Sequence, residues 1–315
     1  MLFDKIIAYD HLKEKLIIIV NMKTNDTKAQ YELAKKDIAE IISTITSPEP
    51  LPKLESDGNV EFTSTYSKEE FCKMVEKTKE YIFDGDIFQC VVSRRFEADY
   101  KNSLINAYRV LRSTNPSPYM VYMSIDGDEI ISTSPETLVK LQNGVLNTFP
   151  IAGSRPRGKT DTEDNALADE LIHDEKELAE HNMLVDLGRN DIGKISEFNS
   201  VKVTKYQEVL RYSKIMHICS EVEGKLKDGL DAFDAIESLL PAGTLSGAPK
   251  IRACEIIEEL ERTPRGVYGG ALGYVDFNGN LDTCIAIRMA VKKNDKVYVC
   301  LLYTSPSPRD ISGSR

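Results

Sequence analysis

The sequence predicts an α+β protein whose strands form antiparallel sheets. Strand-like segments follow one another through short turns, around residues 119–151 and again around residues 270–299. Asp126-Gly127 and Asn143-Gly144 are typical of two-residue hairpin turns. Strands joined so directly pair antiparallel, whereas parallel strands need a long crossover. Helical periodicity is confined to separate stretches, so the pattern is not an alternating βαβ one.

The N-terminal segment, residues 1–46, is predicted to contain two strands and a helix. Apolar, β-branched runs lie at residues 6–10 and 15–22, and residues 25–45 have apolar residues at helical spacing. Residues 47–66 are rich in Pro, Ser and Gly, which predicts a linker or a surface loop.

The rest of the chain alternates between helical and β-rich stretches. Ser67 and Glu70 have the spacing of a capping box, so a helix should begin there and end at Asp84-Gly85. Residues 87–96 and 145–151 each resemble one strand, and residues 162–193 are mainly helical.

Composition is that of a globular protein with an acidic surface. The apolar fraction is 41%, the charged fraction is 29% and the net charge is −10. This balance argues against a general nucleic-acid binder, which needs a broad basic face. No apolar run reaches membrane-spanning length and the N-terminus is unlike a signal peptide, so we expect a cytoplasmic protein. The six cysteines contain no CxxC pair, which favours buried thiols over a zinc or disulfide framework.

A first candidate site lies at the start of a helix near residue 174. Asp174 can cap the helix, and Glu177 and Glu180, three residues apart, share a face. Two such carboxylates can hold a hard cation, and Mg²⁺ suits them because it needs only one or two protein carboxylates. By spacing alone, acids that merely complement the helix dipole explain the pattern at least as well.

A second candidate is the glycine-rich turn LLPAGTLSGAPK, which leads into a helix near Ala248. Free amides at a helix start attract anions, but the motif of a P-loop is missing, so a nucleoside triphosphate is not supported. An ordinary capped helix is the alternative.

Arginines and a histidine give further candidates. Residues 282–293 are predicted to be one strand in which Arg288 shares a face with small residues, away from bulk water. It could reach into a cavity to bind a carboxylate, or it could form a buried salt bridge. Arg155 and Arg157 are either anion contacts or ordinary loop arginines. His217, between apolar residues, is by itself typical of a core histidine.

Taken in order, these segments resemble the chorismate-utilising enzymes, and within that family the component I branch of the anthranilate synthases. The resemblance runs from about residue 67 to Val299. The matching strings are DGDIFQCVVSRRF, NPSPYM, SPET, PIAGSRPRG, DEKELAEHNMLVDLGRNDIG, YSKIMH, PAGTLSGAPK, GVYGGALGY and DTCIAIR. It implies a chorismate-binding fold of two large packed antiparallel sheets with helices outside. Residues 67–299 would be the catalytic domain, incomplete at its C-terminus, and residues 1–46 the remnant of an N-terminal region.

The resemblance also implies an activity. A Mg²⁺-dependent lyase of tryptophan biosynthesis would aminate chorismate and eliminate pyruvate to give anthranilate. The ammonia would come from a separate glutamine amidotransferase subunit, component II.

Site roles follow from the same resemblance. Glu180 would ligate Mg²⁺ with Glu177 beside it, and Glu136 would be the general acid. His217 would lie against the substrate, and Gln89 would occupy the position where water-adding relatives carry a Lys base. The substrate-binding residues would be Gly153, Ser154, Thr244, Tyr268 and Arg288, with Tyr268 and Arg288 binding the enolpyruvyl carboxylate.

Two positions discriminate between relatives. Ala152 argues against aminodeoxychorismate synthase, which resembles PIKGT with a nucleophilic Lys, and Gln89 argues against isochorismate and salicylate synthases. Another chorismate aminase, such as an aminodeoxyisochorismate synthase, remains open, as does a non-catalytic chorismate-binding relative.

The final segment, residues 300–315, departs from the family. Relatives continue with a glycine-rich turn and a further metal-ligand Glu, whereas CLLYTSPSPRD resembles the translation of a sequencing adapter. We expect a non-native tail and impaired activity of the chain as it stands, with a genuine flexible tail as the alternative.

Overall fold

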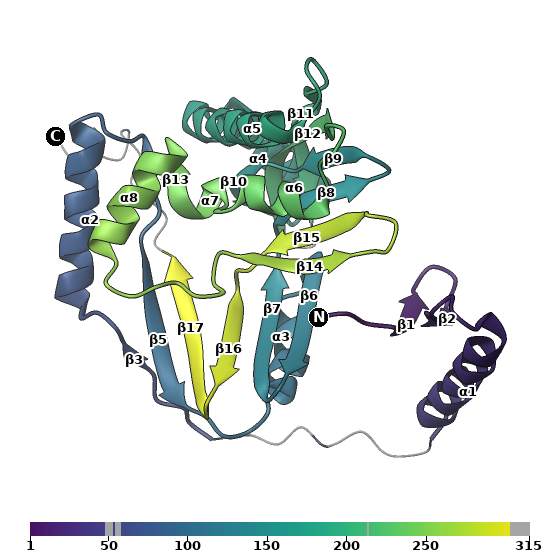
Figure 1. Cartoon of the computed structure of the whole chain (residues 1–315). Coiled ribbons are helices and arrows are strands. Elements are labelled where there is room, and N and C mark those ends of the chain that lie inside the picture. Colours follow the sequence, from purple (N-terminus) through teal and green to yellow (C-terminus); the bar gives the residue numbers. More distant parts are fainter. Residues whose placement is uncertain (48–52, 54–57, 213, 303–315) are drawn as a thin grey trace. The chain divides into compact units, whose positions relative to one another are not determined.

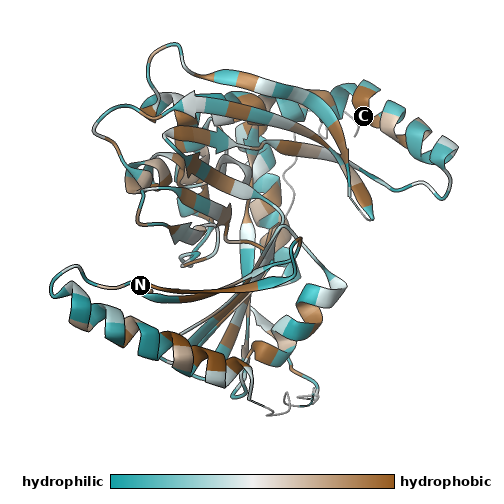
Figure 2. Cartoon of the chain, turned by 90° about the vertical axis from the view of Figure 1, so that its right-hand side faces the viewer, coloured by the Kyte–Doolittle hydropathy of each residue, from teal (hydrophilic) through white to brown (hydrophobic). Residues whose placement is uncertain are grey.

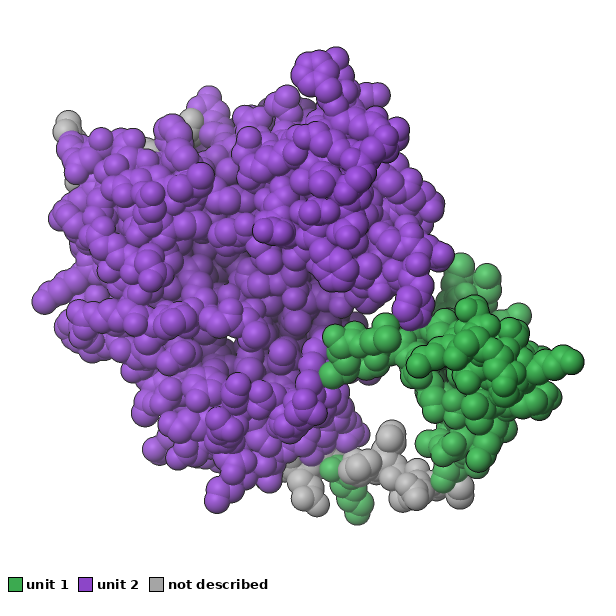
Figure 3. Space-filling view, viewed as in Figure 1, with its two compact units in different colours: residues 1–55 green, residues 56–315 purple. Residues whose placement is uncertain are grey.

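The computed structural model describes residues 1–47, 53, 58–212 and 214–302. The chain divides into two compact units, Met1–Glu55 and Ser56–Arg315 (Figure 3). In the described residues no helix has the length and apolar character needed to cross a membrane.

The first unit has the predicted strand–strand–helix order. Strand β1 (Lys5–Asp10) pairs antiparallel with β2 (Lys15–Val20), and helix α1 (Thr27–Ile45) follows. Apolar residues run along both strands (Figure 2), and several are exposed, including Ile7 and Leu16. Thr63–Ser64 within the expected 47–66 linker forms strand β3, so this end of the segment belongs to the second unit's sheet.

The second unit is built on two antiparallel sheets, as the predicted α+β class requires (Figure 1). The seven-stranded sheet contains β8 (Thr137–Gln142), β9 (Val145–Thr148), β10 (Ile151–Pro156), β11 (Lys202–Arg211), β12 (Ile215–Lys225), β14 (Ala271–Val275) and β15 (Leu281–Ile285). The six-stranded sheet contains β3, β5 (Ser93–Asp99), β6 (Tyr119–Ile125), β7 (Asp128–Ser134), β16 (Met289–Lys293) and β17 (Lys296–Leu302).

Helices cover the sheets and one short ribbon joins distant segments. The helices are α2 (Lys68–Phe83), α3 (Ile105–Thr114), α4 (Asp161–His173), α5 (Glu175–Ile195), α6 (Ala232–Leu239), α7 (Gly243–Ser246) and α8 (Lys250–Leu260). Helices α4, α5 and α6 pack on the seven-stranded sheet, and α3 packs on the six-stranded sheet. Strand β4 (Gln89–Cys90) pairs with β13 (Gly247–Ala248), close to α2 and α8 (Figure 1).

The largest core cluster lies between the seven-stranded sheet, helices α5 and α6, and one face of the second sheet. Leu146, Val139 and Ile192 are fully buried in it, and Ile130 and Val291 of the six-stranded sheet pack against it. Apolar burial contributes roughly 25 cal/mol per Å², so this shared core fixes the sheets against each other.

Local signals in the sequence are largely confirmed. Ser67 and Glu70 form the capping box of α2, and the helix ends at Asp84. Both residues of the Asp126-Gly127 and Asn143-Gly144 turns have positive φ, as such hairpin turns require.

Several boundaries differ from the prediction. The strand expected over 87–96 is interrupted between β4 and β5, and the strand expected over 145–151 ends at Thr148, with β10 starting at Ile151. The helix expected near Ala248 begins at Lys250.

The C-terminal boundary also lies later than expected. Strand β17 continues past Val299, with Cys300, Leu301 and Leu302 paired to β5. Cys300 and Leu302 also pack against the main core, which explains why the strand continues. The remainder of the predicted 300–315 tail, residues 303–315, lies outside the described residues.

Candidate active site

A cavity of about 640 Å³ lies between β10, the start of β12 and the connection from β15 to β16. It brings together half of the predicted site residues. They are Glu136, Gly153, Ser154, His217 and Arg288.

Gly153 forms a bulge in the cavity wall. The register of β10 against β12 shifts between Ala152 and Ser154, and Gly153 has a φ of 69°. Only glycine adopts this conformation without strain. A Cβ at this position would lie 3.0 Å from Oε2 of Glu177 and 3.1 Å from Cδ1 of Leu171. The absence of a side chain therefore lets the start of α5, with its acidic residues, approach the cavity wall.

His217 is oriented by this bulge. It lies opposite Ser154 in the sheet, and its Nδ1 is 2.9 Å from the Gly153 carbonyl oxygen. A carbonyl only accepts hydrogen bonds, so Nδ1 carries the hydrogen and Nε2 is left as the second ring nitrogen. The Tyr212 ring packs edge-on against the imidazole at a centroid distance of 5.9 Å.

The buried core histidine of this region is a different residue. His181 is fully buried, its Nε2 lies 2.6 Å from Ser220 Oγ, and burial lowers its pKa to about 4. His217 is instead partly buried in the cavity lining. The interpretation of His217 as a core histidine is therefore wrong.

The pKa of the Glu136 carboxyl lies well above its ordinary value. Burial raises its pKa to about 7, while the Thr244 hydroxyl and the Arg288 charge oppose part of this rise. Glu136 and Thr244 also line a second, smaller cavity. Thr244 Oγ1 is buried and makes no well-formed hydrogen bond to a described residue, so it influences Glu136 as a nearby dipole. A carboxyl with this pKa can donate a proton near neutral pH.

Arg288 does not lie on one continuous strand, as predicted. The chain leaves the seven-stranded sheet after Ile285 and joins the six-stranded sheet at Met289, and Arg288, between them, has a φ of 46°. Its backbone is held by a hydrogen bond from the Thr133 amide to the Arg288 carbonyl, 3.1 Å long.

The Arg288 side chain is exposed, not cut off from water. Within the described ranges the guanidinium has no ion pair, so the alternative of a buried salt bridge is wrong. A non-glycine residue with positive φ is uncommon, and here it places an arginine without a carboxylate partner beside the cavity.

The acidic start of α5 has the predicted cap. Asp174 accepts hydrogen bonds from the amides of Lys176 and Glu177, at 3.0 and 3.2 Å. Glu177 Oε1 lies 3.6 Å from Arg155 Nη1, and Glu180 is partly buried one turn further along the helix. In the described part of the chain, no three His, Cys, Asp or Glu residues are grouped as a metal site. Two carboxylates suit Mg²⁺ only if water or substrate oxygens complete its shell.

The two loop arginines bind the protein's own carboxylates. Arg155 contacts Glu170 and Asp174 at 2.9 Å as well as Glu177, and Arg157 contacts Asp164 at 2.7 Å. These pairs do not support the interpretation of Arg155 and Arg157 as anion contacts.

Two other predicted residues lie away from the cavity. Gln89, on β4, is not among its described lining residues, and its Oε1 is buried without a hydrogen bond to a described residue. Tyr268 is 7% exposed in the main core, and burial raises its pKa. Its loop is nevertheless tied to the segment before Arg288, because the Gly269 amide donates to the Ala286 carbonyl at 2.9 Å.

Sequence reasoning missed part of the lining. The lining also includes Tyr212, Lys214 and residues 114–118. The NPSPYM and YSKIMH strings contain most of these residues, but neither has a pattern that suggests a chemical role without the fold.

Comparisons with known proteins agree on one family. The family model described as chorismate binding enzyme matches residues 1–301. Anthranilate synthase component 1 of Acetivibrio thermocellus is 49% identical over 307 residues, covering 95% of this chain and 62% of the relative. The corresponding protein of Aquifex aeolicus is 45% identical over 303 residues, covering 95% and 61%.

A solved structure gives the same result. The crystal structure of anthranilate synthase component I from Streptococcus pneumoniae has a TM-score of 0.85 and 42% identity, covering 96% of this chain and 67% of that one. The chain thus spans a little over three fifths of the length of the relatives it matches in sequence.

Proposed function

Since the chain belongs to the chorismate-binding enzyme family, we propose that it forms part of an enzyme that converts chorismate to anthranilate. The observation that carries the proposal is the shared cavity of Glu136, His217 and Arg288, with Glu177 against its Gly153 wall. The relatives named anthranilate synthase component 1 support this reading over other chorismate aminases.

Charge explains why these residue types are needed. Chorismate carries two carboxylates, so it binds only where positive charge offsets them. Arg288, which has no ion pair in the described ranges, would hold the enolpyruvyl carboxylate with its planar fork. Tyr268 would assist from the adjoining loop after a shift of that loop.

Glu177 and Glu180 would hold Mg²⁺ in the substrate complex. The bound ion would supply positive charge at the ring carboxylate, which fits a donor set of two carboxylates with substrate oxygens. In the present structure Arg155 is paired with Glu177, and its guanidinium would have to move away from this carboxylate as the ion binds.

Glu136 would perform the acid step. Hydroxide leaves poorly, so the protonated carboxyl donates its hydrogen as the ring C–O bond breaks and water departs. Ammonia forms the new C–N bond at the carbon next to the carboxylate-bearing one. Loss of the proton there then breaks the enolpyruvyl ether bond, which releases pyruvate and leaves an aromatic amine.

The remaining residues would shape the pocket. His217 would present Nε2 to the substrate, while Gly153 and Ser154 line the pocket beside it and Thr244 lies near the acid. Gln89 cannot act as a base as a lysine would, which favours addition of ammonia over addition of water.

Ammonia would come from a separate glutamine amidotransferase subunit. The motivating observation is that the relatives it matches are named component 1, which implies a second component. The cytoplasm remains our prediction for the compartment.

The test uses the purified 315-residue chain with chorismate, ammonium and Mg²⁺. We expect a rise in melting temperature with chorismate, and equal amounts of anthranilate and pyruvate by mass spectrometry, even at a slow rate. A Glu136→Gln variant serves as the control, because it should bind chorismate without forming product.

Other outcomes separate the alternatives. A non-aromatic aminated acid would identify a different chorismate aminase. Stabilisation by chorismate without any product in a full-length protein would identify a non-catalytic relative. If chorismate neither stabilises the chain nor changes chemically, the proposal is wrong.

A further inference from the structure

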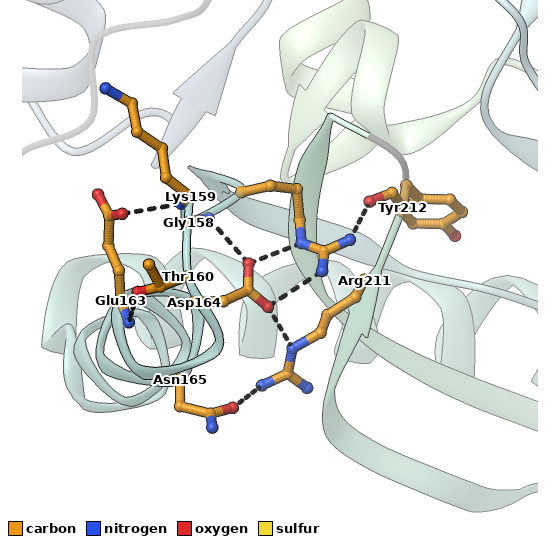
Figure 4. Close-up of polar contacts among 9 residues, drawn as sticks. Gly158, Lys159, Thr160, Glu163, Asp164, Asn165, Arg211 and Tyr212 are labelled. Atoms are coloured by element: carbon orange, nitrogen blue, oxygen red, sulfur yellow. Dashed lines mark hydrogen bonds and ion pairs between the residues drawn. The ribbon is translucent and has the colours of Figure 1, made fainter.

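A buried carboxylate lies on the far side of the wall that carries Tyr212 and His217. Asp164, in the first turns of α4, is 6% exposed and accepts four hydrogen bonds. Arg157 donates two of them, from Nε to Oδ1 at 2.7 Å and from Nη2 to Oδ2 at 3.1 Å. The Gly158 amide donates the third at 2.8 Å and Arg211 Nε the fourth at 3.0 Å (Figure 4).

Two further donors of Arg157, its Nη1 and its backbone amide, hold the backbone of the cavity wall. Its Nη1 donates to the Tyr212 carbonyl at 2.6 Å, and its backbone amide donates to the Lys214 carbonyl at 3.2 Å. Arg157 therefore holds the backbone of two residues that line the cavity. Arg211, which precedes Tyr212, is fixed by Asp164 and by Asn165, whose Oδ1 is 3.1 Å from Nη2 (Figure 4).

The chain path makes room for this cluster. A Cβ on Gly158 would lie 2.2 Å from the Asp164 amide nitrogen, so the loop before α4 passes directly against the helix start. The carboxylate is thus held from two sides, by the loop after β10 and by the end of β11.

We propose that Asp164 is a positioning residue for the candidate active site, acting through Arg157 and Arg211 on Tyr212, Lys214 and His217. The inference rests on the proposed function for the identity of the ligand. Tyr212 packs on the His217 ring, and Lys214 brings a cation to the cavity. Losing the Asp164 charge frees the guanidiniums of both arginines, so the Tyr212 carbonyl loses its fixed side-chain donor.

The cluster is unlike an adventitious surface ion pair. Exposed pairs contribute little, whereas a buried carboxylate with two guanidiniums and an amide has a defined geometry. Its location also matters, because both carbonyls that Arg157 holds belong to cavity-lining residues.

The test compares Asp164→Asn with Asp161→Asn in the full 315-residue chain. Both remove one negative charge from the first turns of α4, but Asp161 is exposed. Calorimetry would measure the dissociation constant for chorismate, and long-range ¹⁵N NMR would follow the ring nitrogens of His217, with His181 as the internal reference.

We expect Asp164→Asn to weaken chorismate binding about tenfold, the size of one lost charge-assisted hydrogen bond. The His217 nitrogen signals should shift while those of His181 stay in place. Asp161→Asn should change neither. Unchanged binding together with unchanged His217 signals in a folded Asp164→Asn chain would overturn the proposal.

Two further arms keep the test decisive. If Asp164→Asn does not fold, Arg157→Lys replaces it, since lysine keeps the charge but cannot hold Asp164 and Tyr212 together. The same His217 shift is expected, and its absence would overturn the inference. If the wild-type chain does not bind chorismate, the proposed function fails, and the NMR comparison still decides whether Asp164 positions His217.

Discussion

Two carboxylate–arginine groups, one in the cavity lining and one behind it, have opposite electrostatic states. Around Asp164, two guanidiniums and a backbone amide satisfy the carboxylate, and Arg157 is the main reason that its pKa falls to about 2. Around Glu136, burial dominates and raises the pKa to about 7, with Arg288 opposing it only through its charge. The same residue types thus give a permanent anion in one place and a proton donor in the other.

The difference lies in what remains unpaired. Asp164 has its hydrogen-bonding capacity filled by the protein, so it can only hold structure. Glu136 and Arg288 line open space without an ion pair to each other, so both can interact with a ligand. Preorganised groups of this kind cost stability and are typical of functional sites.

The largest expected effect tests the acid role of Glu136. Glu136→Gln should lower the rate of anthranilate formation by roughly 10²–10⁴-fold, the usual contribution of a general acid. Chorismate binding should change little, because glutamine keeps the shape. Steady-state kinetics and calorimetry with ammonium as nitrogen donor would measure both.

The pH dependence provides the control for this prediction. Only the protonated carboxyl donates, so at a constant concentration of free ammonia kcat/KM of the wild type should fall as pH rises above about 7. A rate that is flat from pH 6 to 9, or a Glu136→Gln variant with full activity, would assign the acid role elsewhere.

The second prediction concerns the unpaired arginine. Arg288→Ala should weaken chorismate binding by roughly 10–100-fold, since it removes a charge-assisted fork. It should also raise the pKa of Glu136 further, because the Arg288 charge now opposes that rise.

Arg189→Ala is the matched control for Arg288. Arg189 is an exposed arginine on α5 whose partner is Asp186, and its loss should leave binding unchanged. Equal chorismate affinity in the wild type and in Arg288→Ala would remove Arg288 from the proposed site.

The third prediction sets the two carboxylates against each other in stability. The folded-state pKa of Glu136 lies above its ordinary value of 4.5, so its ionisation destabilises the fold as pH rises from 4.5 through 7. Glu136→Gln should therefore stabilise the chain at pH 8 by on the order of 1–3 kcal/mol, and should have almost no effect of this kind at pH 4.

Asp164→Asn should do the reverse. Its folded-state pKa lies below the ordinary 3.8, so its stabilisation is present above that pH and is lost as pH falls toward 2. The variant should be less stable than the wild type at pH 7, with the difference shrinking in acid. Urea unfolding of Glu136→Gln at pH 4 and 8, and of Asp164→Asn at about pH 2.5 and at pH 8, would show the opposite trends, and parallel trends would contradict the comparison.

The smallest expected effect concerns Gly153, where the cavity wall meets the acidic start of α5. Gly153→Ala should cost about 1–3 kcal/mol of stability, because alanine is strained at a φ of 69° and its Cβ would press on Glu177. The His217 ring should shift, since its Nδ1 is bound to the Gly153 carbonyl.

Gly193→Ala is the control for Gly153. It lies in α5 with nothing within 4 Å of the added Cβ, so it should be neutral or slightly stabilising. An equal response of the two glycines would show that the bulge does not constrain the site.

Features that depend on neighbouring residues were predicted correctly from the sequence. The α2 capping box, the Asp174 cap and the two hairpin turns depend on neighbours within four residues, and each is as expected. The site residues Glu136, Gly153, Ser154, His217 and Arg288 were identified by ordered motifs, and the structure brings them to one cavity.

The errors arose where distant chain segments decide the outcome. The segment 282–293 has good strand alternation, yet it breaks at Arg288 because its two halves join different sheets. Arg157 looked like a loop arginine with a choice of roles, but Asp164 lies close to it only after α4 folds against β10.

The sequence by itself determined the α+β class, the antiparallel pairing and the residue types that suit a dianionic substrate, because periodicity, turn chemistry and motif order are local. Only the tertiary structure decided which charges stay unpaired. A carboxylate becomes a satisfied anchor or a proton donor according to how much water and how many partners surround it, and both are fixed by packing between segments far apart in the chain.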